Sequence, residues 1–69
     1  MIDIDSLFTY HAPTEHQAMR YDCIRRQAKE LAKVIVECTP KSADQTAAIR
    51  KLRECVMTAN AAIALEEKE

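Results

Sequence analysis

Apolar residues recur along the chain at alternating steps of three and four positions, in two separate runs. This spacing places them along one side of an α-helix and is typical of helices that pack against each other. The first run consists of Tyr21, Ile24, Ala28, Leu31, Ile35 and Cys38, and the second of Ile49, Leu52, Val56, Ala59 and Ile63. The pattern therefore predicts two helices that face each other along one seam.

Local signals mark where these helices begin and end. Two pairs of residues have the spacing of a capping box, in which side chains satisfy the free amide groups of the first helical turn. The pairs are Thr14 with Gln17 and Ser42 with Gln45. Pro40 ends the first helix because proline cannot continue one. We predict helices over residues 14–39 and 42–66, and the short connection between them requires an antiparallel hairpin.

The first thirteen residues show no clear helical period. They end in Ala12 and Pro13, and a residue before proline is pushed towards extended geometry. We therefore expect residues 1–13 to form an extended arm. At the other end, residues 66–69 all carry charged side chains and are expected to form a solvated, fraying tail.

The second helix carries more apolar surface than one partner helix can cover. From Cys55 to Leu65 it is apolar or small on nearly every face, and such a helix is buried on more than one side. A chain of 69 residues also exposes too much surface to be comfortably stable alone. We therefore predict an all-α fold in which the hairpin assembles into a compact homo-oligomer. Asn60, a lone polar residue on this face, would either fix the register of an interface or bind a ligand base.

Composition argues against several classes of protein. The three cysteines, Cys23, Cys38 and Cys55, lie far apart, which fits neither a disulfide framework nor a zinc site and favours small buried thiols inside a cell. There is no glycine for a phosphate loop and no spacing typical of a catalytic group, so we expect no enzyme activity, metal or cofactor. A net charge of −1 and the lack of a long apolar run argue against bulk DNA or RNA and against a membrane.

Two regions could bind an anion. Tyr10 and His11 precede Pro13 and a helix N-terminus, where free amide groups and the helix dipole favour anionic ligands. The alternative is that Phe8 and Tyr10 only pin the arm to a neighbouring helix. Arg53 lies on the second helix beside the predicted subunit contact. There it either pairs with a carboxylate or grips a phosphate bidentately.

Two long stretches of the chain carry a family resemblance. They are Phe8–Thr14 followed by Gln17, Arg20, Tyr21 and Ala28–Ala32, and Thr39–Pro40 followed by Ser42 and Lys51–Ala64. Together they resemble the phage anti-CBASS protein 2 family. The resemblance implies a compact helical homohexamer that binds cyclic dinucleotides and, in a separate pocket, cyclic trinucleotides, without cleaving either. In the cytoplasm of the infected bacterial host, such a protein keeps CBASS immune effectors from being activated.

The resemblance also implies roles for particular residues. It indicates that Arg53 and Thr14, contributed by different protomers around a three-fold axis, line the trinucleotide pocket. It places Tyr10, His11 and Pro13 near the dinucleotide pocket. The chain departs from the family pattern in two ways, which together suggest a smaller interface. Thr58 stands where the family often has tryptophan, and residues 45–49 replace a more leucine-rich stretch.

Two other functions remain open. The hairpin could be an interaction protein that docks a partner helix on its apolar face. A small nucleic-acid regulator would instead use a basic strip on the second helix, but the near-neutral charge and the lack of a clear helix-turn-helix pattern disfavour it. On the first helix, Arg26, Lys29 and Lys33 lie three or four positions apart, near Glu30 and Glu37, and predict an ordinary charged surface.

Overall fold

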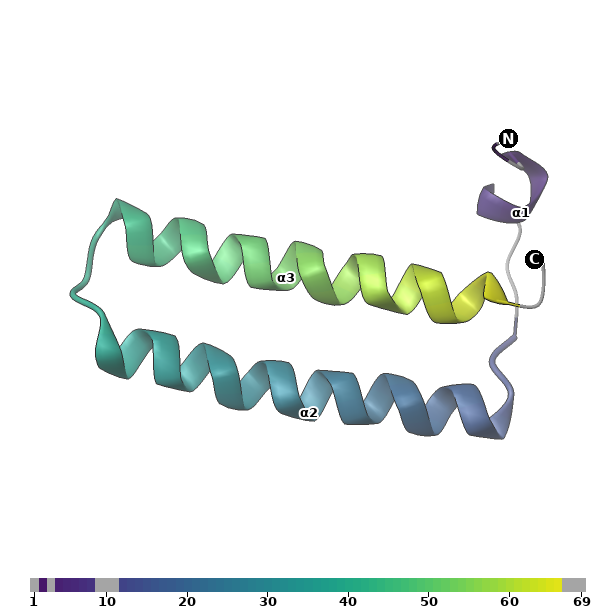
Figure 1. The fold of residues 1–69 in the computed structure, drawn as a ribbon, viewed down its shortest axis with the longest axis horizontal. Coiled ribbons are helices and arrows are strands. Elements are labelled where there is room, and N and C mark those ends of the chain that lie inside the picture. The colour runs from purple at the N-terminus through teal and green to yellow at the C-terminus, as the bar shows by residue number, and fades with distance from the viewer. Residues whose placement is uncertain (1, 3, 9–11, 67–69) are drawn as a thin grey trace.

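The computed structural model describes residues 2, 4–8 and 12–66, and these contain three helices. The short helix α1 spans Ile4–Phe8, and the two long helices are α2, Glu15–Cys38, and α3, Ala43–Ala64. Figure 1 shows α2 and α3 lying antiparallel along their whole length, joined by a tight connection, while α1 lies next to the C-terminal end of α3, on the side away from α2. The predicted antiparallel hairpin is therefore confirmed.

The start and end of α2 follow from local hydrogen bonds. The Thr14 hydroxyl accepts a hydrogen bond from the Gln17 amide at 3.1 Å, and the Gln17 side chain accepts one from the Thr14 amide at 3.1 Å. This is the predicted capping box. At the other end, the backbone amide and the hydroxyl of Thr39 both donate to the carbonyl of Ile35, at 3.1 and 2.6 Å. The helix then stops before Pro40, as predicted.

The second predicted capping box is only half formed. The Ser42 hydroxyl accepts from the Gln45 amide at 3.1 Å and so caps α3. The Gln45 side chain turns instead towards the end of α2, where its amide group donates to the carbonyls of Thr39 and Val36 at 3.1 and 3.3 Å. The prediction was wrong here because those free carbonyls lie within reach across the connection. Gln45 thus ties the two helices together at the closed end of the hairpin.

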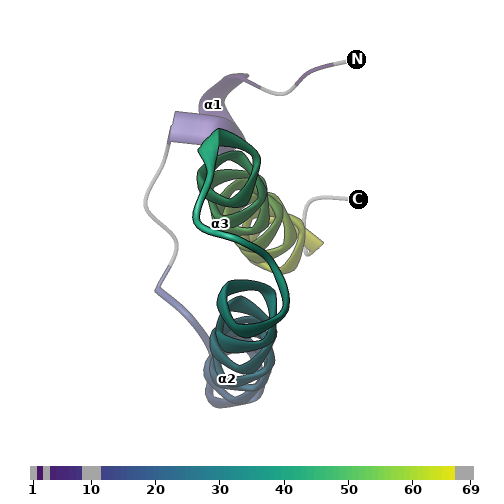
Figure 2. The ribbon, with the colours of Figure 1, turned by 90° about the vertical axis from the view of Figure 1, so that its left-hand side faces the viewer.

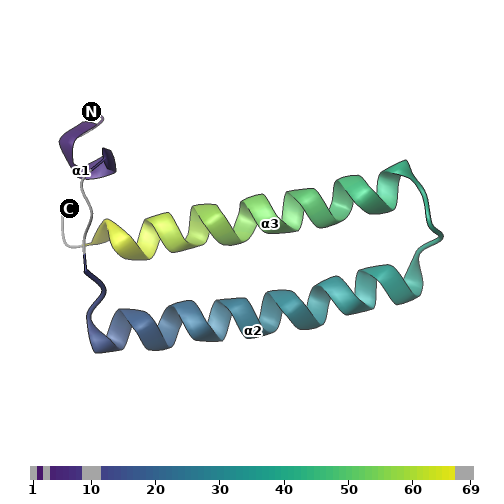
Figure 3. The ribbon, with the colours of Figure 1, turned by 180° about the vertical axis from the view of Figure 1, so that it is seen from behind.

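The expectation of an extended arm was wrong for residues 4–8, which form α1. Ile4, Leu7 and Phe8 lie on one face of this short helix, but five residues are too few to show a hydrophobic period. The negative charge of Asp5 in the first turn interacts favourably with the helix dipole. Phe8 is 84% exposed. Figure 3 shows α1 standing clear of the seam between α2 and α3. Between α1 and α2, the described residues 12–14 are non-helical. This is the part of the predicted arm that agrees with the structure.

The core of the hairpin is thin. Most of the predicted seam residues are half-buried where α2 faces α3, but Leu31 and Cys38 are exposed and Ala32 takes a place in the seam. Among the described residues only Ile63 and Gln17 are buried. Each of two packed helices can bury only one stripe of side chains against the other, so a single hairpin cannot bury many more residues than this. Figure 2, viewed along the helices, shows no further layer on either side of them.

One chain therefore leaves a large surface uncovered. Its radius of gyration is 14.9 Å, against roughly 11 Å for a compact domain of this length. Its accessible surface is 5932 Å², whereas a folded monomer of this mass exposes roughly 4,400 Å². Exposed apolar side chains, including Val34, Val36 and Met57, lie along both long helices. No helix in the described part of the chain is long and apolar enough to span a bilayer.

Candidate functional site

Arg53 lies halfway along α3 and is exposed beside a shallow apolar hollow of about 250 Å³. The hollow is lined by Ala28 and Ala32 from α2 and by Ile49, Leu52, Arg53, Val56 and Met57 from α3. None of the ion pairs between described residues includes Arg53. Within one chain the guanidinium is therefore available to a ligand or to another subunit. Its five fixed donors suit a phosphate, and the apolar floor suits a flat, weakly polar group.

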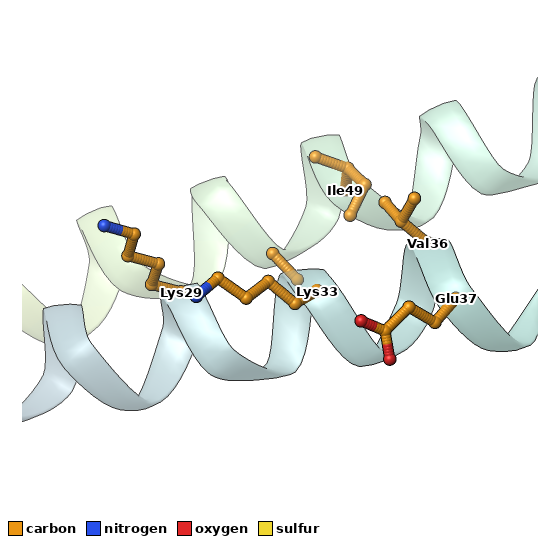
Figure 4. Close-up of a pocket in the computed structure, with 6 residues that line it drawn as sticks. Lys29, Lys33, Val36, Glu37 and Ile49 are labelled. Atoms are coloured by element: carbon orange, nitrogen blue, oxygen red, sulfur yellow. The ribbon is translucent and has the colours of Figure 1, made fainter.

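A second hollow of about 430 Å³ continues along the same face (Figure 4). It shares Ala32 and Ile49 with the first and adds Lys29, Lys33, Val36 and Glu37. The two hollows form one groove, which we call the Arg53 groove. Its floor is apolar, and its edges carry positive charge from both helices and one carboxylate, Glu37. Such a groove can hold an anion that has an apolar part.

The opposite face of the hairpin bears a different groove, of about 280 Å³. Its lining consists of Cys23, Ile24, Gln27, Ala28 and Leu31 from α2, and Leu52, Cys55, Val56 and Ala59 from α3. We call it the thiol groove. All three cysteines are free and exposed in the single chain, so the prediction of buried thiols was wrong for an isolated hairpin. The thin core explains this, because no second layer covers the flanks of the seam.

A polar cluster closes the open end of the hairpin. The buried Gln17 side chain donates to the Ile63 carbonyl at 2.9 Å and to the Glu66 carboxylate at 3.2 Å. Arg20 forms an ion pair with the same carboxylate. Glu66 is thus anchored, and its assignment to a solvated tail was wrong; residues 67–69 lie outside the described residues. The Gln17 side chain joins the cap of α2 to the end of α3, a role that its spacing in the sequence does not reveal.

This cluster makes stability depend on pH. The Arg20 ion pair, and then the Gln17 hydrogen bond, hold the pKa of Glu66 below its ordinary value of 4.5. Because the folded pKa is the lower one, this stabilising effect is present above pH 4.5 and is lost as the pH falls through the folded pKa. We expect Glu66→Gln to lower the thermal midpoint at neutral pH and to flatten its acid dependence. Circular dichroism melts across that pH range measure both.

The matched control is Glu54→Gln, which removes an exposed carboxylate of α3 outside the cluster. Because the Glu66 pair is partly solvated, the effect on the midpoint should be small. Identical acid profiles for Glu66→Gln and the wild type would show that the pair contributes nothing to stability.

The structure separates the predicted site residues within one chain. Thr14 and Pro13 are exposed at the open end of the hairpin, and Thr14 uses its hydroxyl to cap α2. Arg53 lies beside Ala28, fourteen residues further along α2 from Thr14, which corresponds to about 21 Å of helical rise. Thr14 and Arg53 of one chain therefore cannot contact the same small ligand. Tyr10 and His11 lie outside the described residues.

Asn60 is half-buried on α3, and its side-chain oxygen is buried without a hydrogen-bond partner among the described residues. An unpaired buried oxygen is costly, so this atom is a candidate for a contact with another chain or a ligand. Its role as an interface residue stays a prediction. Within the ranges that the structure describes, no group of histidine, cysteine and acidic side chains could hold a metal ion.

Comparison with protein families gives one match. The family model described as the Acb2/Tad1 hairpin domain matches residues 2–64, which include α1, α2 and α3. Searches of curated proteins and of solved structures returned no match. The matched region contains all five predicted site residues, from Tyr10 to Arg53. The resemblance noted from the sequence is thus confirmed at the level of the family.

Proposed function

We propose that this chain, which belongs to the Acb2/Tad1 hairpin family, binds cyclic di- and trinucleotide messengers and sequesters them without cleaving them. In an infected bacterium this would keep CBASS immune effectors from being activated, and the protein would act in the host cytoplasm. The observation that carries the proposal is the family match over residues 2–64, the whole hairpin. The unpaired Arg53 beside an apolar groove fits a ligand made of phosphates and bases.

The working form is a homo-oligomer, and we propose a hexamer. One chain buries only two of its described residues and exposes about 1,500 Å² more surface than a compact monomer of its mass. A stable interface commonly buries about 800 Å² on each partner. The excess is therefore large enough for contacts with more than one neighbour. Both long grooves and the exposed face of α1 are available for this purpose.

Assembly would complete the ligand sites. Thr14 and Arg53 are too far apart within one chain, so a trinucleotide pocket that uses both takes them from different protomers. Three such pairs around a three-fold axis match a ring with three phosphates. Tyr10, His11 and Pro13 are assigned to the dinucleotide pocket, where the ring of Tyr10 would stack on a base.

Isothermal titration of the intact protein with cyclic di- and trinucleotides tests the proposal. We expect saturable binding of both, with fewer than one trinucleotide per chain because several chains share each pocket. A linear trinucleotide is the matched control and should bind more weakly, since its phosphates are not held in a ring. A protein that instead docks a partner helix would release no heat with any of these nucleotides, and that result would reject the sponge.

The proposed mechanism is binding alone. The sequence has no spacing typical of a nucleophile with an orienting base. We therefore expect cyclic trinucleotide incubated with excess protein to be recovered intact after heat denaturation, as judged by chromatography. Ligand incubated in buffer alone is the control. Accumulation of a linear product over many turnovers would show that the protein is an enzyme.

A further inference from the structure

The positive side chains on and near the Arg53 groove differ in their partners. Lys33 pairs with Glu30 at 3.5 Å, and Arg25, one turn before Lys29, pairs with Asp22 at 3.2 Å. Such pairs three or four residues apart are the usual state of charges on a helix surface. Lys29 and Arg53 take part in no ion pair with any described residue. The groove thus carries two cations that no ion pair within the described residues engages, together with one carboxylate, Glu37.

These two cations lie at nearly the same height on the hairpin. The register is given by two hydrogen bonds between the helices, from Gln17 to Ile63 and from Gln45 to Val36. In that register Lys29 of α2 faces residues 51–52 of α3, one or two positions from Arg53. The offset along the helix axis is about 3 Å or less. Lys29 lines one hollow and Arg53 the other, and the two hollows share Ala32 and Ile49, so the two charges flank one apolar floor.

We propose that Lys29 is a second phosphate-binding residue of the site that Arg53 forms; this rests on the proposed function. The arginine supplies a planar, bidentate contact, whereas the lysine ammonium on its long stem adds a compact charge that can follow the phosphate. Between them, Ala32, Ile49 and Val56 offer an apolar surface for the adjoining sugar or base. The site therefore suits ligands in which an anionic phosphate lies next to the flat face of a sugar or base.

The test compares Lys29→Ala with Lys51→Ala by isothermal titration with a cyclic trinucleotide. Lys51 is the same residue type, is exposed on α3 and lies about 200° around that helix from Arg53, so it should not reach the groove. We expect Lys29→Ala to weaken binding at least about tenfold at low salt, and Lys51→Ala to leave it unchanged. Lys29→Arg should restore most of the affinity, and added salt should reduce the difference.

Light scattering and thermal melts show whether each variant keeps the mass and stability of the wild type. If Lys29→Ala and Lys51→Ala bind as the wild type does while Arg53→Ala does not, Lys29 has no part in the site and this inference is wrong. If Lys29→Ala weakens binding only by dissociating the oligomer, Lys29 is an interface residue and the inference is also wrong. If the wild type itself binds no cyclic nucleotide, the proposed function fails, and the inference fails with it.

Discussion

Arg53→Ala is expected to abolish binding of cyclic trinucleotide while the oligomer remains intact. A three-fold pocket would present one Arg53 to each of three phosphates, so the substitution removes three contacts from one ligand. A hydrogen bond to a charged group contributes about 1.5–3 kcal/mol. Losing three contacts therefore costs more than about 4 kcal/mol, a drop in affinity of roughly a thousandfold or more. Because Arg53 is exposed and unpaired within its own chain, its loss should not unfold the hairpin.

Isothermal titration measures the affinity and light scattering the assembly. Arg26→Ala is the control, since Arg26 is also exposed but pairs with Asp22 at 3.2 Å. Tyr10→Ala should show the reverse selectivity and weaken dinucleotide binding more than trinucleotide binding. Dissociation of the oligomer by Arg53→Ala would make Arg53 an interface ion-pair partner. Equal loss of both ligands in an intact oligomer would indicate one pocket, not two.

Ala62→Glu is expected to break the assembly. Ala62 is exposed in the single chain and lies on α3 next in line after Ala59 and Cys55, which line the thiol groove. Small side chains at these positions let another helix approach closely. A glutamate there would be buried without a partner on assembly, at a cost of several kcal/mol. The hairpin has little core of its own, so the separated chains should also lose helical structure.

The wild type should scatter light as a multiple of its 7.8 kDa chain at micromolar concentration, and Ala62→Glu as a single chain. Circular dichroism would report the accompanying loss of helix. Ala43→Glu makes the same substitution at the first residue of α3, where an acidic side chain suits the helix dipole, and should assemble normally. A well-folded wild-type monomer, or an Ala62→Glu variant of unchanged mass, would contradict the predicted interface.

The sequence was sufficient for those features that depend on local spacing. The seam, the antiparallel connection and the Thr14 capping box need only residues within a few turns of one another. The side chains of Gln17, Gln45 and Glu66 have roles that sequence could not reveal, because their partners lie on the other long helix. Helix α1 was missed because five residues are too few to establish a period.

The candidate site was predictable only in part. Arg53 stood out because it is a cation beside a run of small and apolar residues. Lys29 did not, since its spacing from other charges is that of any solvated helix surface. Its distinction appears only once the neighbouring cations are seen to be paired and the groove is seen to join it to Arg53. No pattern within one sequence records which residues of different protomers meet in the assembly.

The thin core has a consequence for timing. Among the described residues, Ile63 is the one buried aliphatic side chain, so the hairpin would gain its stability from neighbouring chains. Its folded fraction would then rise steeply with protein concentration. Newly made chains would stay frayed and open to proteases until enough of them accumulate to assemble. Bound nucleotide would then favour the assembled form by mass action. Such a protein would respond to two thresholds at once, the amount of its own synthesis and the amount of messenger that the cell has produced.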